Sequence, residues 1–245
     1  MKSDVAHYEG LTYWGPIRPE RMEAIFDLVL LSPESRVLDL GCGRGEILAR
    51  LAERFESNVV GVDRSEAAIA LARRQLQARA PKTDSELMVL DVAEFKPAEP
   101  FDLVSWVGGP YVGENFESTL ATLTSWTRHG GYVLVGHGFW DHEPPTDYLD
   151  ASGIDKGEFG GRLDTMTRGR EAGLTLLYSS VSSRDEWDAF EGRILFNWEE
   201  HCRLGASDED RRTLERKRAW NDLQQRWGRT AMGFGLYLFR RPATT

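Results

Sequence analysis

The sequence is poor in cysteine and contains no long apolar run. Cys42 and Cys202 are the two cysteines among 245 residues, so they cannot build a disulfide framework, and neither belongs to a CxxC pair of the kind that binds zinc. No stretch approaches the roughly 18 uncharged apolar residues of a membrane span, and residues 1–10 lack the basic and then apolar order of a secretory signal. We therefore expect a cytoplasmic protein with no membrane partner and no structural metal.

Positive charge is also scarce. Acidic residues outnumber basic ones by 39 to 30, which gives a formal net charge of −9 at pH 7. A field of this sign repels polyanions on average, so we expect no nucleic-acid partner. The arginines of residues 211–218 are interleaved with acidic residues, which is more typical of a solvated helix face than of a basic patch.

The first 140 residues alternate between segments of helix type and strand type, a pattern typical of parallel βαβ units. The helix that precedes the fifth predicted strand is expected to end near Gly130 and Gly131. A hydrophobic content of 41% is ordinary for a packed core, and we expect one domain over residues 1–245. Apolar runs predict strands at 36–40, 58–63, 86–91, 101–106, 132–136, 174–178 and 235–240.

Three other segments interrupt or precede this alternation. Residues 141–172 are rich in glycine, proline and acidic residues, so we expect an irregular insertion with short helices. Residues 183–230 carry tryptophan and other apolar side chains at helical spacing and predict a helical cap, in which most tryptophans belong to the core. Residues 1–30 combine an aromatic run with a helix that starts at Pro19, and they are expected to form a lid segment.

A glycine-rich loop follows the first predicted strand and precedes a helix. Gly41, Gly43 and Gly45 allow a ligand to approach the backbone closely, because side chains at these positions would block it. Their spacing is GxGxG, whereas dinucleotide-binding loops have GxGxxG. Glu46 stands at the third position of that pattern, where a carboxylate would repel a pyrophosphate. The loop is therefore predicted to bind a ligand without phosphates.

Residues 37–45, with the sequence VLDLGCGRG, closely resemble the first motif of the class I S-adenosylmethionine-dependent methyltransferases. Asp63 ends the second predicted strand 18 residues after Gly45 (63 − 45), and Asp91 ends the third, as acidic residues do in that family. The resemblance covers residues 18–140 well and the last two strands more loosely. It implies an α/β, Rossmann-like, doubly wound seven-stranded sheet of order 3-2-1-4-5-7-6, with strand 7 antiparallel and a helical insertion between strands 6 and 7.

The same resemblance implies S-adenosylmethionine as cofactor and S-adenosylhomocysteine as product. Asp63 would accept hydrogen bonds from the ribose hydroxyls, Asp91 would lie near the adenine amino group, and Asp39 would face the methionine end. Asp63 as a turn residue and Asp91 as a helix cap are the alternative interpretations. The expected cofactor-binding residues are Asp39, Gly41, Cys42, Gly43, Gly45, Asp63, Arg64, Asp91, Val92 and Trp106.

The resemblance also implies methyl transfer, most simply to a small molecule. After the fourth predicted strand the sequence reads SWVGGPY in place of the Asn/Asp-Pro-Pro-Tyr motif of many base and protein methyltransferases, and this difference favours a small acceptor. The methylated atom (O, N, S or C) stays open, because a fold does not specify its acceptor. Two alternatives are a different reaction on the same fold and a catalytically silent module that binds the cofactor or a partner. The oligomeric state is expected to be a monomer or a homodimer.

The candidate catalytic residues are His137 and Tyr13. His137 is expected just beyond the fifth strand with a pKa suited to a general base, although a loop histidine held by a backbone carbonyl is an equal alternative. The aromatic run 7–16 resembles lid segments of small-molecule methyltransferases, and an arm packed on the core is its alternative. Residues 141–143 with His137 could suggest a metal cluster, but a solvated loop is expected and no metal. The candidate substrate-binding residues are Tyr8, Trp14, Tyr111 and Trp140.

Overall fold

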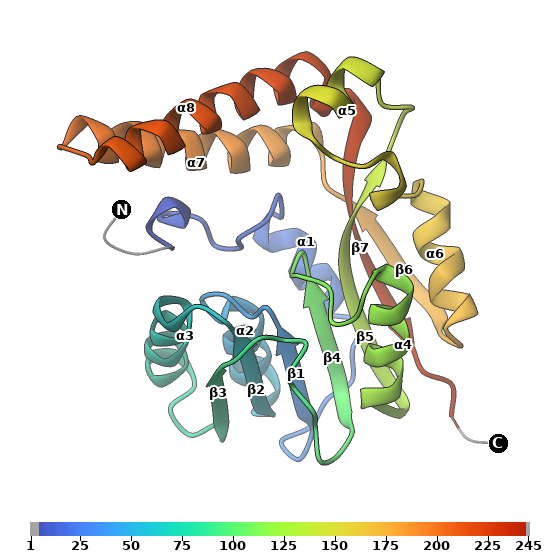
Figure 1. Cartoon of the computed structure of the whole chain (residues 1–245). Coiled ribbons are helices and arrows are strands. Elements are labelled where there is room, and N and C mark those ends of the chain that lie inside the picture. The colour runs from blue at the N-terminus through green and yellow to red at the C-terminus, as the bar shows by residue number, and fades with distance from the viewer. Residues whose placement is uncertain (1–4, 244–245) are drawn as a thin grey trace. The chain divides into compact units, whose positions relative to one another are not determined.

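The computed structural model describes residues 5–243, and its strands form one sheet of order β3-β2-β1-β4-β5-β7-β6 with β7 antiparallel (Figure 1). This order confirms the predicted fold class. Parallel pairing joins β1 to β2 and β4, β2 to β3, and β4 to β5. The strands are β1 (Arg36–Leu40), β2 (Asn58–Asp63), β3 (Ser85–Val89), β4 (Phe101–Val107), β5 (Thr127–Trp140), β6 (Thr175–Val181) and β7 (Met232–Arg240).

Helices connect the strands and follow the predicted periodicity. No helix among residues 5–243 is long and apolar enough to cross a membrane. The α-helices are α1 (Pro19–Phe26), α2 (Glu46–Phe55), α3 (Glu66–Arg79), α4 (Phe116–Trp126), α5 (Thr146–Ser152), α6 (Arg162–Glu171), α7 (Arg184–Arg203), α8 (Asp208–Leu223) and α9 (Arg229–Ala231). Two short 3₁₀ turns, η1 (Ala6–Tyr8) and η2 (Lys156–Glu158), and a π-helical turn, η3 (Gln224–Gly228), complete the elements.

The side chains of β1 show how the parallel part of the sheet is packed, since successive side chains of a strand point to opposite faces. Leu38 faces a buried apolar cluster that includes Leu120 of α4. Asp39 faces the other side together with its register partner Gly61, where an added Cβ atom would lie 2.7 Å from Leu48 of α2. Both faces of β1 are thus covered, which explains its nearly continuous apolar sequence.

The boundary between α4 and β5 differs from the sequence prediction. α4 ends at Trp126, because Thr127 already has extended backbone and pairs with Phe101 of β4. Gly130, with a φ of +80°, and Gly131 lie at a register shift inside β5. The N–H of Gly130 donates to the carbonyl of Arg241, and the carbonyl of Gly131 accepts from the N–H of Arg241. The expectation that the two glycines stop the helix was therefore wrong, since they form an irregularity in a long strand.

The described chain divides into two compact units, and the division passes through β5, β6 and β7. The first, called the sheet unit here, comprises Glu20–His137, Thr165–Ser180 and 236–243. The second, called the aromatic unit, comprises 5–19, Gly138–Asp164 and Val181–Gly235. The sheet unit contains the glycine-rich loop, whereas the aromatic unit contains the N-terminal aromatic run and the two long helices.

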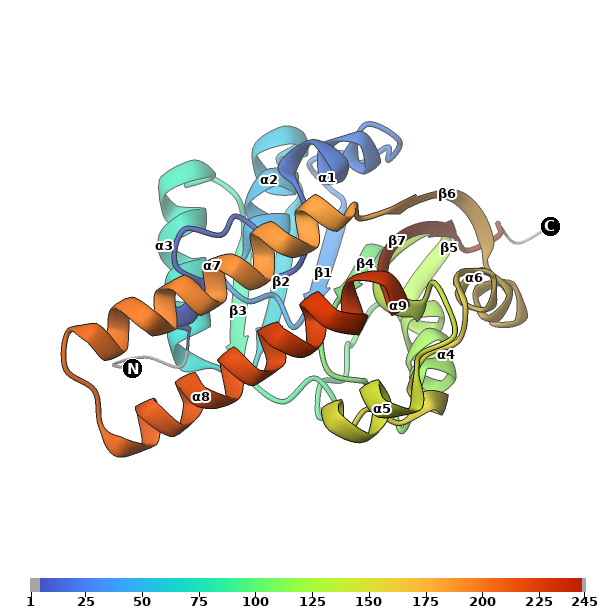
Figure 2. The ribbon, with the colours of Figure 1, turned by 90° about the horizontal axis from the view of Figure 1, so that it is seen from above.

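The aromatic unit is built around α7 and α8, which lie side by side along their lengths (Figure 2). Each helix begins with a capping box, made by Ser183 with Glu186 and by Ser207 with Asp210. Trp198 of α7 belongs to a small buried cluster in this unit, which Tyr8 and Leu11 of the N-terminal run also contact. The apolar spacing of residues 183–230 therefore corresponds to real helices, as predicted.

Candidate functional site

The glycine-rich loop joins β1 to α2 with three residues in left-handed backbone. Gly41, Gly43 and Gly45 have φ angles of +69°, +53° and +74°. A Cβ atom at Gly41 would lie 3.3 Å from the Cα atom of Gly109, and one at Gly45 would lie 2.8 Å from the Cβ atom of Ala72. Backbone conformation and close packing both require glycine, so the loop presents bare backbone.

Asp63 ties this loop to the start of α3. One carboxylate oxygen, Oδ2, accepts a hydrogen bond from the backbone N–H of Gly43 at 2.9 Å. The other, Oδ1, accepts a hydrogen bond from Ser65 N–H at 2.9 Å. Arg64, between Asp63 and Ser65 in the sequence, is exposed. Asp63 thus makes the turn bonds of its alternative interpretation, and it also stands at the carboxyl end of β2 where the family resemblance places a ribose ligand.

Asp91 lies two residues after the end of β3, the strand that pairs with β2. β2 and β3 are joined where Leu90 N–H donates to the carbonyl of Asp63 at 3.0 Å, so the two aspartates come from adjacent strand ends. The exposed Asp91 carboxylate accepts a hydrogen bond from Ala93 N–H at 2.9 Å, which forms a turn rather than a helix cap. Val92 points into the buried apolar cluster. The structure therefore brings Asp63 and Asp91 to one edge of the sheet.

Asp39 is buried at the carboxyl half of β1. Ser105, its register partner on β4, donates a hydrogen bond from Oγ to Oδ1 of Asp39 at 2.6 Å. Burial raises the pKa of Asp39 to about 7, whereas the Ser105 hydrogen bond lowers it and the negative charge of Asp63 raises it further. This carboxyl group therefore changes its charge near neutral pH.

Cys42 fills the space beneath the glycine-rich loop. Its sulfur would lie 3.0 Å from a Cβ atom at Gly61, and the side chain is buried. Burial raises the pKa of the Cys42 thiol well above its usual range, and the carboxylates of Asp39 and Asp63 raise it further. The thiol stays protonated, so Cys42 is a packing residue of the loop and not a nucleophile.

His137 lies within β5, not beyond it as predicted, and it is buried among aromatic rings. Its imidazole stacks on Phe116 with ring centroids 4.0 Å apart, and its Nε2 atom lies 3.3 Å from the hydroxyl oxygen of Tyr111. Burial lowers the pKa of His137 to about 4, and the positive charge of Arg168 lowers it further. The expected pKa in the range of a general base was therefore wrong, because the sequence does not reveal this burial.

Trp106 lies in the same aromatic cluster. Its ring is fully buried and stacks on Tyr111 with centroids 5.8 Å apart, while Nε1 donates to the carbonyl of Pro110 at 2.8 Å. Tyr111 is the partly exposed member of the cluster. Trp106 therefore supports the loop after β4, and Tyr111 is the ring that this loop presents.

The predicted residues of the N-terminal run all belong to the aromatic unit. Tyr8 stacks on Trp14 with centroids 4.6 Å apart, and Tyr13 is buried. Asn197 of α7 donates to the carbonyls of residues 7 and 9 at 2.9 Å each. The side chain of Glu186 accepts a hydrogen bond from Arg18 N–H at 3.0 Å. These contacts attach the run along α7.

Trp140 and the loop after it are also part of the aromatic unit. Trp140 Nε1 donates to the carbonyl of Lys156 at 2.9 Å, and its ring meets Phe159 edge to face with centroids 5.4 Å apart. His142 lies 2.9 Å from the carbonyl oxygen of Thr230 through Nδ1. Within residues 5–243, no three His, Cys, Asp or Glu side chains are grouped so that they could hold a metal ion.

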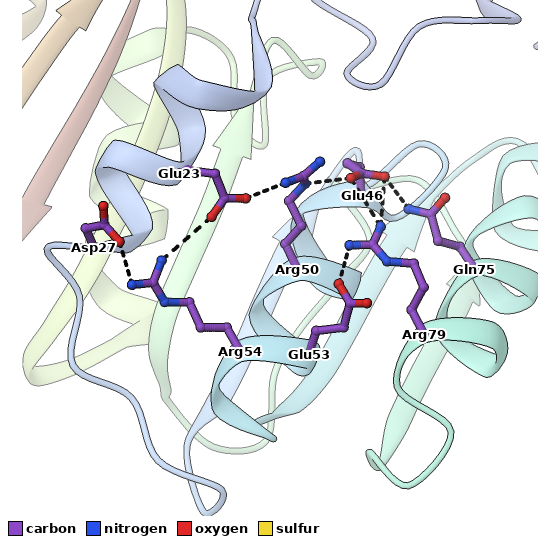
Figure 3. A network of polar contacts seen from close by, with 8 residues as sticks. All are labelled: Glu23, Asp27, Glu46, Arg50, Glu53, Arg54, Gln75 and Arg79. Atoms are coloured by element: carbon purple, nitrogen blue, oxygen red, sulfur yellow. Dashed lines mark hydrogen bonds and ion pairs between the residues drawn. The ribbon is translucent and has the colours of Figure 1, made fainter.

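A polar network that the sequence analysis missed surrounds Glu46 at the start of α2 (Figure 3). The buried Glu46 carboxylate accepts hydrogen bonds from Arg50 Nε at 2.6 Å, Gln75 Nε2 at 2.6 Å and Arg79 Nη1 at 3.1 Å. Two guanidinium groups thus compensate its charge, so Glu46 is not the bare carboxylate from which repulsion of a pyrophosphate was argued. The spacing of four between Glu46 and Arg50 was the available sequence signal.

Figure 3 shows that this network continues across three helices. Arg50 also pairs with Glu23 of α1, and Arg54 Nη2 pairs with Asp27 at 2.5 Å. Arg79 of α3 pairs in addition with Glu53 of α2. The network holds α1, α2 and α3 together directly behind the glycine-rich loop.

A family model described as a methyltransferase domain matches residues 37–131. The uncharacterized protein YjhP of Escherichia coli is 23% identical over 178 residues, which cover 72% of this chain and 72% of YjhP. The trans-aconitate 2-methyltransferase of Paracidovorax citrulli is 39% identical over 116 residues, covering 44% of this chain and 40% of that enzyme. This last match spans less than half of either protein.

One solved structure superposes on almost all of this chain. The SAM-dependent methyltransferase of Geobacter sulfurreducens, crystallised in complex with S-adenosyl-L-homocysteine, superposes with a TM-score of 0.88 and 20% identity. The superposition covers 97% of this chain and 96% of that protein. Identity at this level shows a common fold.

Proposed function

We propose that this chain, which belongs to the class I S-adenosylmethionine-dependent methyltransferases, methylates a small organic molecule. The observation that carries the proposal is the cofactor edge of the sheet. There, a loop of bare backbone follows β1, and three carboxylates stand in β1, at the end of β2 and two residues after β3, namely those of Asp39, Asp63 and Asp91. Ligands of open α/β sheets bind at these carboxyl ends.

The residues at this edge fit the chemistry of S-adenosylmethionine. Asp63 can accept hydrogen bonds from a ribose diol, and Asp91 with Val92 can receive the adenine end. Asp39 and the backbone of Gly41 suit the methionine end, which carries an ammonium group. Gly43 presents bare backbone to the nucleoside, and Gly45 lets the loop pack closely on Ala72 of α3. Cys42, Arg64 and Trp106 line or support the loop. When bound, the cofactor supplies a methyl group on an electrophilic sulfonium centre.

Tyr111 and His137 are proposed to contact the acceptor. Tyr111 lies in the loop after β4 and His137 lies in β5, both near the carboxyl ends of the parallel strands. A histidine with a pKa of about 4 is neutral at physiological pH, so it can orient a hydrogen bond but is a weak base. Methyl transfer in this proposal depends on placing the nucleophile in line with the methyl group, which accounts for much of the rate.

The proposal extends to the aromatic unit. Tyr8, Trp14 and Trp140 are proposed acceptor-contacting residues, because aromatic faces attract cations such as a sulfonium or an amine acceptor. Tyr13 is a proposed catalytic residue. The proposed lid over residues 1–30, of which 1–4 lie outside the described part of the chain, and the proposed cap over 183–230 would exclude water from the reaction. The relative named a trans-aconitate 2-methyltransferase supports a small acceptor, although the match covers 40% of that enzyme.

Calorimetric titration of the purified chain tests the cofactor assignment. We expect binding of S-adenosylmethionine and S-adenosylhomocysteine and no binding of NAD, because the loop has the spacing GxGxG and not the GxGxxG of dinucleotide-binding loops. Acceptors are then screened by release of S-adenosylhomocysteine, with mass spectrometry of the product. A product heavier by one methylene supports the proposal. A changed product without that gain would indicate another reaction, and cofactor binding without turnover of any acceptor would indicate a silent binding module.

A further inference from the structure

The buried pair of Asp39 and Ser105 has a geometry that the glycine motif alone does not require. The two residues are register partners on neighbouring parallel strands, and their exposed fractions are 2% and 0%. Ser105 Oγ lies 2.6 Å from Oδ1 of Asp39 and 3.2 Å from the carbonyl oxygen of Leu38. A serine hydroxyl has a single proton, and the shorter contact to a carboxylate is the stronger hydrogen bond.

We propose that Ser105 is a positioning residue for the cofactor, whose hydroxyl holds the Asp39 carboxylate charged and oriented toward the ammonium group of S-adenosylmethionine. This inference rests on the proposed function, since it concerns the same cofactor. Ser105 acts through Asp39, and a fixed carboxylate loses less conformational freedom when the ammonium group binds.

The groups that face Asp39 determine how its charge responds to pH. Asp63 faces it from β2 with a negative charge, and the protonated thiol of Cys42 faces it from the loop. β4 contributes the uncharged hydroxyl of Ser105. Glu46 of α2 directs its carboxylate to arginine and glutamine side chains of α2 and α3. Among these facing groups, the Ser105 hydrogen bond is the one that lowers the pKa of Asp39.

A bell-shaped pH dependence of cofactor affinity follows. Affinity rises as Asp39, with a pKa of about 7, becomes ionised. It falls again at higher pH, where the α-amino group of the ligand loses its charge. Removal of the Ser105 hydroxyl raises the pKa of Asp39, so it shifts the acidic limb of the bell to higher pH and leaves the basic limb unchanged.

The test is calorimetry of the full chain at pH 6 to 9 with three ligands. S-Adenosylmethionine and S-adenosylhomocysteine carry the ammonium group, whereas 5′-methylthioadenosine lacks it. Ser105→Ala is expected to weaken the first two about tenfold at pH 7 and the third less than twofold, as for one lost hydrogen bond to a charged group. Ser105→Thr keeps the hydroxyl and should restore affinity. Ser35→Ala is the matched control, because Ser35 is a buried serine just before β1.

Four results would overturn the assignment or the function on which it rests. Equal weakening of all three ligands, or an acidic limb that does not move in Ser105→Ala, would mean that Ser105 only supports the fold. If Ser105→Ala does not fold, Ser105→Cys, with a weaker donor at the same place, carries the same comparison. Failure of the unaltered chain to bind any of the three ligands would remove the proposed function itself, whereas normal binding with an unaffected variant would remove only the role of Ser105.

Discussion

The sheet unit and the aromatic unit use polar groups in different ways. In the sheet unit, carboxylates stand at the ends of neighbouring strands beside a loop of glycines, and Asp39 is held by a single buried serine hydroxyl. In the aromatic unit, rings pack on rings, and indole and amide groups donate to backbone carbonyls, as Trp140 and Asn197 do. In the proposed function, the first arrangement binds the cofactor and the second contacts the acceptor.

The two units should also respond differently to substitution. A change in the sheet unit should alter cofactor affinity and the fold together, because loop, strands and polar network are connected. A change in the aromatic unit should affect acceptor turnover more than cofactor affinity. Four substitutions test this contrast.

The largest expected effect is that of Gly45→Val. The residue must keep a φ of +74°, and its new side chain would begin 2.8 Å from the Cβ atom of Ala72. We expect the free energy of unfolding to fall by about 3 to 4 kcal/mol, measured by urea denaturation. Gly153→Val in the aromatic unit is the matched control. It has a φ of +70° with no atom within 4 Å of an added Cβ, so it should lose only about 1 to 2 kcal/mol. Equal losses would contradict the packing argument.

The second effect concerns the stability that the protein loses in acid because His137 is buried. Its pKa in the folded protein is about 4, below the ordinary value of 6.5, so the neutral form is favoured by folding. The unfolding free energy is therefore highest, as far as His137 is concerned, above pH 6.5. It falls by roughly 3 kcal/mol as the pH falls to 4, because protonation then favours the unfolded state. His137→Phe should therefore flatten the decline of unfolding free energy between pH 6.5 and 4. His129→Phe, at an exposed position, should leave that decline unchanged. Parallel declines in all three proteins would show that His137 is not buried as described.

The third effect is on cofactor affinity. Asp63→Ala should weaken binding of S-adenosylmethionine by about 1 to 3 kcal/mol, the order expected for lost hydrogen bonds to a charged acceptor, measured by calorimetry. Asp188→Ala in the aromatic unit removes a carboxylate that pairs with Arg229 at 2.9 Å, and it should leave this affinity unchanged. An unchanged affinity of the Asp63 variant would reject the ribose assignment.

The smallest expected effect is that of Asn197→Ala. It removes two hydrogen bonds to the N-terminal run and should cost about 1 kcal/mol of local stability, visible as faster amide hydrogen exchange in residues 6–11. If that run is a lid, methyl-transfer turnover should fall while the affinity for S-adenosylhomocysteine changes less than twofold. Faster exchange with unaltered turnover would favour the alternative of an arm that only packs on α7.

The sequence by itself determined the parts that depend on local backbone and on strand order. Three closely spaced glycines after an apolar strand predicted a loop of bare backbone. The structure shows that all three have left-handed backbone and that Gly41 and Gly45 are also closely packed. The apolar runs predicted all seven strands, with ends that shifted by a few residues. The family resemblance then implied the sheet order that the structure shows.

Only the tertiary structure decided properties that depend on residues far apart in the chain. The pKa values of Asp39 and His137 follow from burial and from neighbours on other strands and helices, which periodicity does not reveal. Glu46 looked like a free carboxylate until Gln75 and Arg79 of α3 were placed beside it. Local rules specify where the backbone must be bare, whereas the charge of a buried group is set by whatever the fold packs around it.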